Sequence, residues 1–165
     1  MSLSIILIMI YTNLRLAEVI RSKINTCMIE QGKLIIETMI LKKPTGKVKI
    51  SLKQMNDKCL CPIEWVKKWA EIKQYQEGEC WILSDLKLIK PEQWSRYVRQ
   101  EMVRAGIDKA QSVTSIRAAA ITKAFQLGAT TEAVNRWTRH SNAASTIQKY
   151  YDKNRNDDIR EKIVR

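Results

Sequence analysis

The sequence is poor in the residues that build metal sites. It has one histidine and four cysteines, of which Cys59 and Cys61 form a Cys-x-Cys pair. A zinc site needs four Cys or His ligands at recognisable spacings, and neither a second pair nor a second histidine completes this one. We therefore expect no metal, and we interpret the cysteines as reduced thiols of an intracellular chain.

Long apolar runs are also missing. The most apolar stretch, SLSIILIMIY at residues 2–11, is about half the length of a membrane span. It lacks the basic segment and the small-residue cleavage site of a signal peptide. We predict that Ser4–Tyr11 is a buried core helix, and we expect no membrane partner.

Acidic residues are outnumbered. The 165 residues contain 17 Asp and Glu against 29 Lys and Arg, a net charge of +12, and 45% are hydrophobic. This length and composition fit one domain with a core. The positive charge favours a nucleic acid as partner, and the alternative is a basic surface that binds no polyanion.

The segment 24–52 has the pattern of strands. Three runs rich in β-branched residues, INTCMIE, KLIIETMIL and KVKISL, are separated by turn sequences at Gln31-Gly32 and Pro44-Thr45-Gly46. We predict a three-stranded antiparallel meander. Lysines 42, 43 and 47 flank its second hairpin, where they either prevent edge-to-edge aggregation or bring a cation to a phosphate.

The rest of the chain has helical spacing. We predict helices over 62–75, Pro91–Ala105, Ser112–Gln126, about 131–139 and 143–153, with Trp65 and Trp69 in the core. Ser112 or Thr114 is expected near the N-cap of the third of these helices. The fold class is therefore mainly α (α+β) with a small antiparallel sheet.

Two arginines stand at predicted helix starts. Asn13 tolerates a left-handed backbone, so the chain can turn there and begin a helix on which Arg15 and Glu18 are one turn apart. Arg117 falls in the first turn of its helix, where the helix dipole disfavours a cation unless an anion is held there. For Arg15 the alternative is a solvated ion pair with Glu18.

These residues suit the cleavage of a phosphodiester without a metal. The reaction needs fixed cations where negative charge collects, a nucleophile, and a proton donor for the leaving oxygen. Arginine forks match phosphate oxygens, tyrosine can form a covalent phosphoester, and a lysine can act as general acid. The last predicted helix supplies the tyrosines, Tyr150 and Tyr151.

The order of these residues resembles the catalytic domain of the tyrosine recombinases, the phage-integrase superfamily, over residues 11–151. TNLRLAEV resembles the Gly-Leu-Arg-x-x-Glu box, and KKPTGK resembles the Lys-Thr-Gly hairpin. VTSIRAAA resembles the His-x-x-Arg box, and WTRHSNAASTIQKYY resembles the Gly-His-Ser…Tyr box.

The resemblance implies a site and a reaction. The implied catalytic residues are Arg15, Lys43, Arg117, His140 and Tyr150. The arginines and the histidine would bind the scissile phosphate, Lys43 would protonate the 5′ oxygen, and Tyr150 would attack phosphorus. Glu18 would be a structural acid beside the first arginine. The intermediate would be a 3′-phosphotyrosyl DNA, with no metal, ATP or other cofactor.

Three positions depart from the family's boxes. Asn13 and Arg139 replace glycines, and Thr114 replaces the histidine of His-x-x-Arg. Threonine can donate a hydrogen bond but does not exchange a proton near neutral pH. One alternative is therefore a catalytically impaired, DNA-binding relic of a mobile-element recombinase. Another is an unrelated basic helical interaction protein, in which Arg15 and Arg117 would lie apart.

The spacing before the tyrosine pair leaves the nucleophile open. The interval from His140 to Tyr150 is one residue longer than usual in the family. Tyr151 is therefore the alternative nucleophile, and its other expected role is core packing.

The resemblance also implies an organisation and partners. We expect a catalytic domain at residues 1–153 and a charged tail at 154–165, without the family's usual N-terminal DNA-clamping domain. The chain would then be either a fragment of a longer recombinase or the relic described above. The implied partners are double-stranded DNA and further copies of the chain, assembled as a tetramer on it. The expected location is with DNA, in a eukaryotic nucleus or a prokaryotic cytoplasm.

Overall fold

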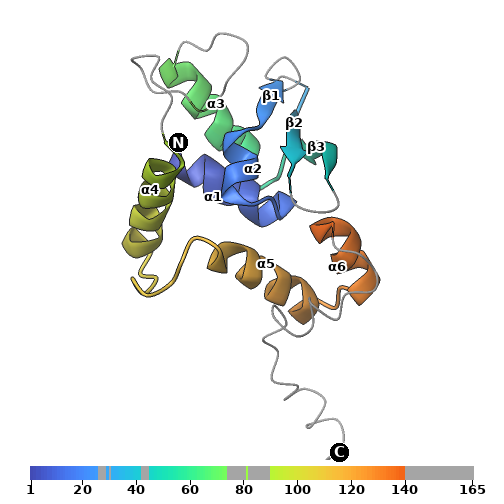
Figure 1. The fold of residues 1–165 in the computed structure, drawn as a ribbon. Helices are drawn as coiled ribbons and strands as arrows, with labels where there is room; N and C mark the ends of the chain where they lie inside the picture. The colour runs from blue at the N-terminus through green and yellow to red at the C-terminus, as the bar shows by residue number, and fades with distance from the viewer. Residues whose placement is uncertain (26–28, 30, 42–44, 74–80, 82–89, 140–165) are drawn as a thin grey trace, which may run out of the picture.

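The computed structural model describes residues 1–25, 29, 31–41, 45–73, 81 and 90–139. Within these residues the chain forms six helices and a three-stranded sheet (Figure 1). In chain order they are α1 (Ser2–Thr12), α2 (Leu16–Ile20), β1 (Lys23–Asn25), β2 (Lys33–Ile40), β3 (Gly46–Lys53), α3 (Pro62–Lys73), α4 (Pro91–Arg104), α5 (Ser115–Gln126) and α6 (Thr131–Thr138). The predicted fold class, mainly α with a small antiparallel sheet, is confirmed.

Helix α1 lies at the centre of the molecule, where α3, α4 and α5 contact it (Figure 1). Its sequence, SLSIILIMIYT, is apolar on nearly every side, as expected of a helix surrounded by protein. Ile5 and Ile8 are completely buried, and the Ser4 hydroxyl donates to the carbonyl of Trp65 at 3.1 Å. The predicted core helix is confirmed. Neither α1 nor any other helix of the described residues has the length and apolarity needed to cross a bilayer.

The sheet is the predicted antiparallel meander, in the order β1–β2–β3. Alternate residues of β2 are buried, because successive side chains of a strand point to opposite faces. Ile36 at its middle pairs with Ile24 of β1 and Ile50 of β3. At one end Ile40 pairs with Gly46, so the two strands flank the sequence that was predicted to form the turn between them.

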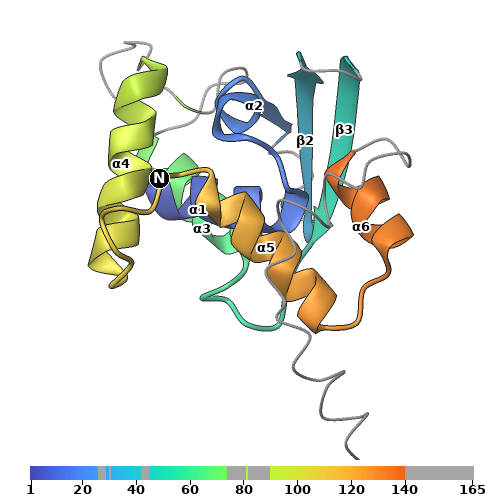
Figure 2. The ribbon, with the colours of Figure 1, turned by 60° about the horizontal axis from the view of Figure 1, so that its bottom comes forward.

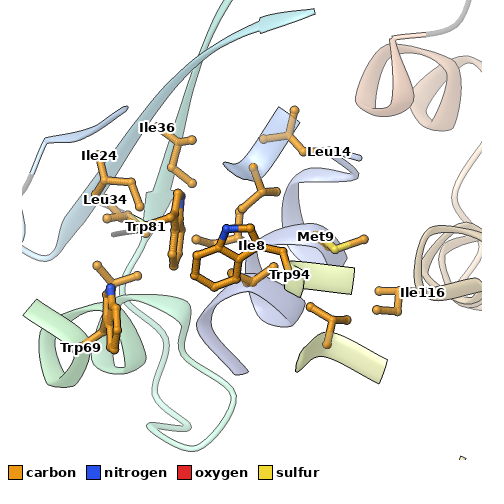
Figure 3. Close-up of a cluster of buried hydrophobic side chains, with 14 of the residues drawn as sticks. Ile8, Met9, Leu14, Ile24, Leu34, Ile36, Trp69, Trp81, Trp94 and Ile116 are labelled. Carbon is orange, nitrogen blue, oxygen red and sulfur yellow. The ribbon is translucent and has the colours of Figure 1, made fainter. Parts of the chain in front are cut away.

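Tryptophans join the sheet to the helices. Trp81 lies between the sheet and α4, and its ring meets Trp94 edge to face with centroids 6.2 Å apart (Figure 3). Trp69 of α3 is buried as predicted. Trp65 is only partly buried, unlike the core residue predicted: its Nε1 donates to the carbonyl of Cys59 at 2.8 Å, so the ring lies at the edge of α3.

A smaller apolar cluster joins α5 to α6. Ile121 and Val134 are buried in it, with Phe125 and Trp137 packed against them. Helix α5 begins three residues later than predicted, because Ser112–Thr114 form the turn that leads into it. The hydroxyl of Thr130 caps α6 by accepting from the backbone N–H of Ala133 at 3.2 Å.

Removing a side chain from α1 tests its central position. We expect Ile8→Ala to lower the free energy of unfolding by about 2–5 kcal/mol, because it opens a cavity in a closed core. Ile72→Ala is the matched control, since Ile72 is a helical isoleucine that is 77% exposed. Its free energy of unfolding should change by less than about 0.5 kcal/mol. Urea unfolding of both variants measures the difference, and equal losses would contradict the packing around α1.

Candidate active site

The site begins at the turn that ends α1. Asn13 follows the helix with φ 52, in the left-handed region predicted for it. The Thr12 hydroxyl fixes the turn by donating to the carbonyl of Ile8 at 2.6 Å and accepting from the backbone N–H of Leu14 at 3.2 Å. The chain thus turns between the two helices, and Arg15 is the N-cap residue of α2.

Arg15 is held by a buried carboxylate. Glu18 accepts from the backbone N–H of Arg15 at 2.7 Å and from its guanidinium at 2.8 Å. The Glu18 side chain is 4% exposed, and that of Arg15 is 36% exposed. The hydroxyl of Thr38 on β2 donates to the backbone carbonyl of Glu18 at 2.7 Å. The predicted pair is present, and it fixes one side of Arg15 while the other remains accessible.

Arg117 lies in the first turn of α5, as predicted, and is only 6% exposed. Its Nε donates to the Oδ1 of Asn13 at 2.8 Å. A cation at this end of a helix gains nothing from the helix dipole. The contact with Asn13, 104 positions earlier in the sequence, therefore ties the start of α5 to the end of α1 (Figure 2).

Both arginines line one pocket of about 570 Å³. The other lining residues are Met9, Leu16, Ala17, Ser95, Ser112, Val113, Thr114, Ser115 and Ala118. No carboxylate is among these residues, so the side chains that face the pocket give it a net positive charge. Two guanidinium groups and several hydroxyls around one cavity are suited to an anion the size of a phosphate.

Thr114 lies in this pocket and occupies the N-cap position of α5. Its hydroxyl caps no backbone N–H and instead shares a 2.6 Å hydrogen bond with the hydroxyl of Ser112. The structure thus places Thr114 beside the two arginines, as the resemblance to the His-x-x-Arg box implied. A hydroxyl there can donate to an anion but cannot act as a proton-exchanging base near neutral pH.

Arg139 is a residue whose role the sequence reasoning missed. Its guanidinium donates to the carbonyl of Thr12 at 2.8 Å. Burial lowers the pKa of Arg139 below its ordinary value; the carboxylate of Glu18 opposes this shift, and the charge of Arg15 adds to it. Because an arginine keeps its proton in proteins, a third positive charge lies close to Glu18 and Arg15.

A signal for this role was present in the sequence. Among the described residues, Asn13 and Arg139 are the two non-glycine residues with positive φ. They are also the two positions at which glycine is expected from the boxes described above. A left-handed backbone is a physical reason for glycine at both positions. Both side chains form hydrogen bonds: Asn13 accepts from Arg117, and Arg139 donates to the carbonyl of Thr12. A side chain that was merely tolerated in place of glycine would not be expected to form such a bond.

Lys43, His140, Tyr150 and Tyr151 lie outside the described residues. Of the predicted set, the structure brings together Arg15, Glu18, Arg117 and Thr114.

Comparisons with known proteins give a family and a fold. The model of the Phage integrase family matches residues 1–157. A search of curated proteins gave no match.

Three solved structures share the fold. The XerA recombinase matches with a TM-score of 0.68 and 14% identity, over 99% of this chain and 56% of its own. The XerH site-specific recombinase bound to difH substrate, a pre-cleavage complex, matches with a TM-score of 0.63 and 16% identity. The match covers 95% of this chain and 44% of that recombinase. XerH in a post-cleavage complex with palindromic difH matches with a TM-score of 0.66 and 17% identity. The match covers 98% of this chain and 45% of that recombinase. The chain spans about half the length of these recombinases.

Substitution of Arg139 separates backbone strain from the loss of its hydrogen bond. Arg139→Gly and Arg139→Ala both remove the guanidinium that binds Thr12, but only glycine adopts a φ of 60 without strain. We expect the alanine variant to have a free energy of unfolding about 1 kcal/mol lower than the glycine variant. Urea titration of both variants measures this difference. Equal stabilities would contradict a left-handed residue at this position.

Proposed function

The chain belongs to the phage integrase family, the tyrosine recombinases, and we propose that it breaks and rejoins DNA through a 3′-phosphotyrosyl intermediate. The observation that carries the proposal is the shared pocket of Arg15 and Arg117. An unrelated basic helical protein would have no reason to bring these two arginines together across about 100 residues.

In the proposed reaction the two guanidinium groups bind the non-bridging oxygens of the scissile phosphate. The Tyr150 hydroxyl gives its proton to water, and its oxygen attacks phosphorus. The bond from phosphorus to the 5′ oxygen breaks, and Lys43 gives that oxygen a proton. Attack by a 5′ hydroxyl on the phosphotyrosine reverses these steps and rejoins a strand. Fixed cations are effective here because they stabilise charge that develops in the transition state.

The roles of the other residues follow from the family's boxes. His140 would bind the same phosphate, and Glu18 would hold Arg15 in place through its two hydrogen bonds. Thr114 would donate a hydrogen bond to a phosphate oxygen. The pairing of β2 with β3 supports the role of Lys43. The two strands are paired as far as Ile40 and Gly46, and Lys43 lies between these two residues in the sequence.

Double-stranded DNA is the proposed partner. The net charge of +12 supports this, as does the fact that the XerH recombinase was solved with its difH substrate. We further propose that residues 1–153 are the catalytic domain and that four copies assemble on paired DNA sites.

A second candidate is a DNA-binding protein of the same fold that does not cut. Thr114 favours it, because a threonine lines the pocket at the position where the family's box has a histidine, which could accept a proton. DNA affinity that falls steeply with salt, without any covalent adduct, would support this candidate. An adduct linked through tyrosine would exclude it.

Covalent capture tests the nucleophile. The probe is a pool of labelled nicked duplexes of random sequence around the nick, and the readout is protein–DNA adduct that survives denaturation. We expect adduct with the wild-type chain, none with Tyr150→Phe, and an undiminished amount with Tyr151→Phe, because only the nucleophile needs its hydroxyl. Adduct that persists in Tyr150→Phe and disappears in Tyr151→Phe would assign the nucleophile to Tyr151.

The pocket itself is tested at Arg15. We expect Arg15→Ala to slow adduct formation by about 10²–10³-fold, as the loss of one fixed transition-state donor does elsewhere. Arg21→Ala is the matched control, since Arg21 is an exposed arginine at the other end of α2 and does not line the pocket. A similar rate for both alanine variants would mean that Arg15 acts only through the net charge.

A further inference from the structure

Asn13 is a buried polar residue with a left-handed backbone. It is completely buried, it has a left-handed φ of 52, and its side chain is polar. Glycine would adopt this backbone conformation without strain, and the family's box has glycine here. The side chain of Asn13 therefore needs a reason beyond the turn.

The contact with Arg117 supplies a reason. An arginine side chain only donates hydrogen bonds, so the Oδ1 of Asn13 must face its Nε, at 2.8 Å. The amide nitrogen then points the other way, where it is buried and has no partner within the described part of the chain. The contact with Arg117 thus fixes the orientation of the Asn13 amide, although in this orientation its N–H₂ group has no hydrogen-bond acceptor among the described residues.

The hydrogen bond from Arg117 to Asn13 affects how the Arg117 guanidinium is oriented in the pocket. Arg117 lines the pocket, whereas the buried Asn13 does not and forms a hydrogen bond with Arg117 alone among the residues that line it, through its side chain. Because guanidinium is planar, a fixed Nε–H direction restricts the plane in which its two terminal nitrogens lie. Asn13 also belongs to the same turn as Arg15, so one short segment determines the positions of both arginines.

We propose that Asn13 is a positioning residue, which holds the guanidinium of Arg117 in the plane that binds the scissile phosphate. This inference rests on the proposed function, because it assigns Arg117 a phosphate ligand. It concerns a side chain that the family's glycine cannot provide, and the effect of Asn13 passes entirely through Arg117.

Asn13→Gly removes the acceptor and keeps the turn, since glycine favours positive φ. The first readout is the Nε–H signal of Arg117 in the nitrogen-15 NMR spectrum, assigned by its absence in Arg117→Ala. We expect hydrogen exchange at this group to be at least about tenfold faster in Asn13→Gly than in wild type, because a buried hydrogen bond has been removed. Asn135→Ala is the matched control: Asn135 is also a buried asparagine, on α6, and its substitution should leave this exchange rate unchanged.

The second readout separates positioning from general destabilisation. Inorganic phosphate is titrated into the wild type, Asn13→Gly, Arg117→Ala and the double variant, followed by NMR shifts of the α5 backbone N–H groups. We expect Asn13→Gly to weaken phosphate binding about three- to tenfold in the wild-type background and to have no effect in the Arg117→Ala background. Adduct formation should show the same dependence, with a loss of about tenfold or more in the rate at saturating DNA.

The outcomes distinguish this inference from the proposed function. If wild type forms no adduct, the proposed chemistry fails, and the phosphate titration alone decides the role of Asn13. If Asn13→Gly leaves both the exchange rate and the phosphate affinity unchanged, the inference is overturned, whatever the adduct assay gives. An equal loss with and without Arg117 would also overturn it, because a purely structural role predicts that result.

Discussion

The C-terminal end of α1 is the point on which both the core and the pocket depend. The last carbonyls of a helix have no partner within it and carry a partial negative charge. Here the indole of Trp137 and the guanidinium of Arg139 donate to the last two carbonyls of α1, at 3.0 and 2.8 Å. Arg117 binds the amide of Asn13, the next residue. Side chains from more than 100 positions later in the chain thus close around a single turn.

This arrangement concentrates positive charge in a small volume. Arg15 and Arg139 repel one another, and the buried carboxylate of Glu18 attracts both. Arginine keeps its proton in proteins, so the charge of these guanidinium groups does not change with pH in the physiological range. An anion in the pocket would reduce the repulsion between these guanidinium groups.

The parts that could be predicted from the sequence are those that local pattern determines. The apolar run of α1 and the alternation in β2 are local features, and both elements form where they were expected. That Arg15 and Arg117 meet at one pocket follows from the order of the family's boxes, since no local pattern relates residues 102 positions apart. The contacts of Asn13 and Arg139 were not predicted, because they depend on how α5 and α6 pack against α1. Lys43, His140 and the tyrosine pair stay predictions.

The central position of α1 has a consequence for how the chain folds. During translation α1 is made before the helices that cover it, and one of these, α5, ends at Gln126. At synthesis rates of roughly 5–20 residues per second, on the order of ten seconds separate the two. During that interval an eleven-residue apolar helix lacks part of its cover. Until α5 has been made, the apolar side of α1 that it covers is exposed to water.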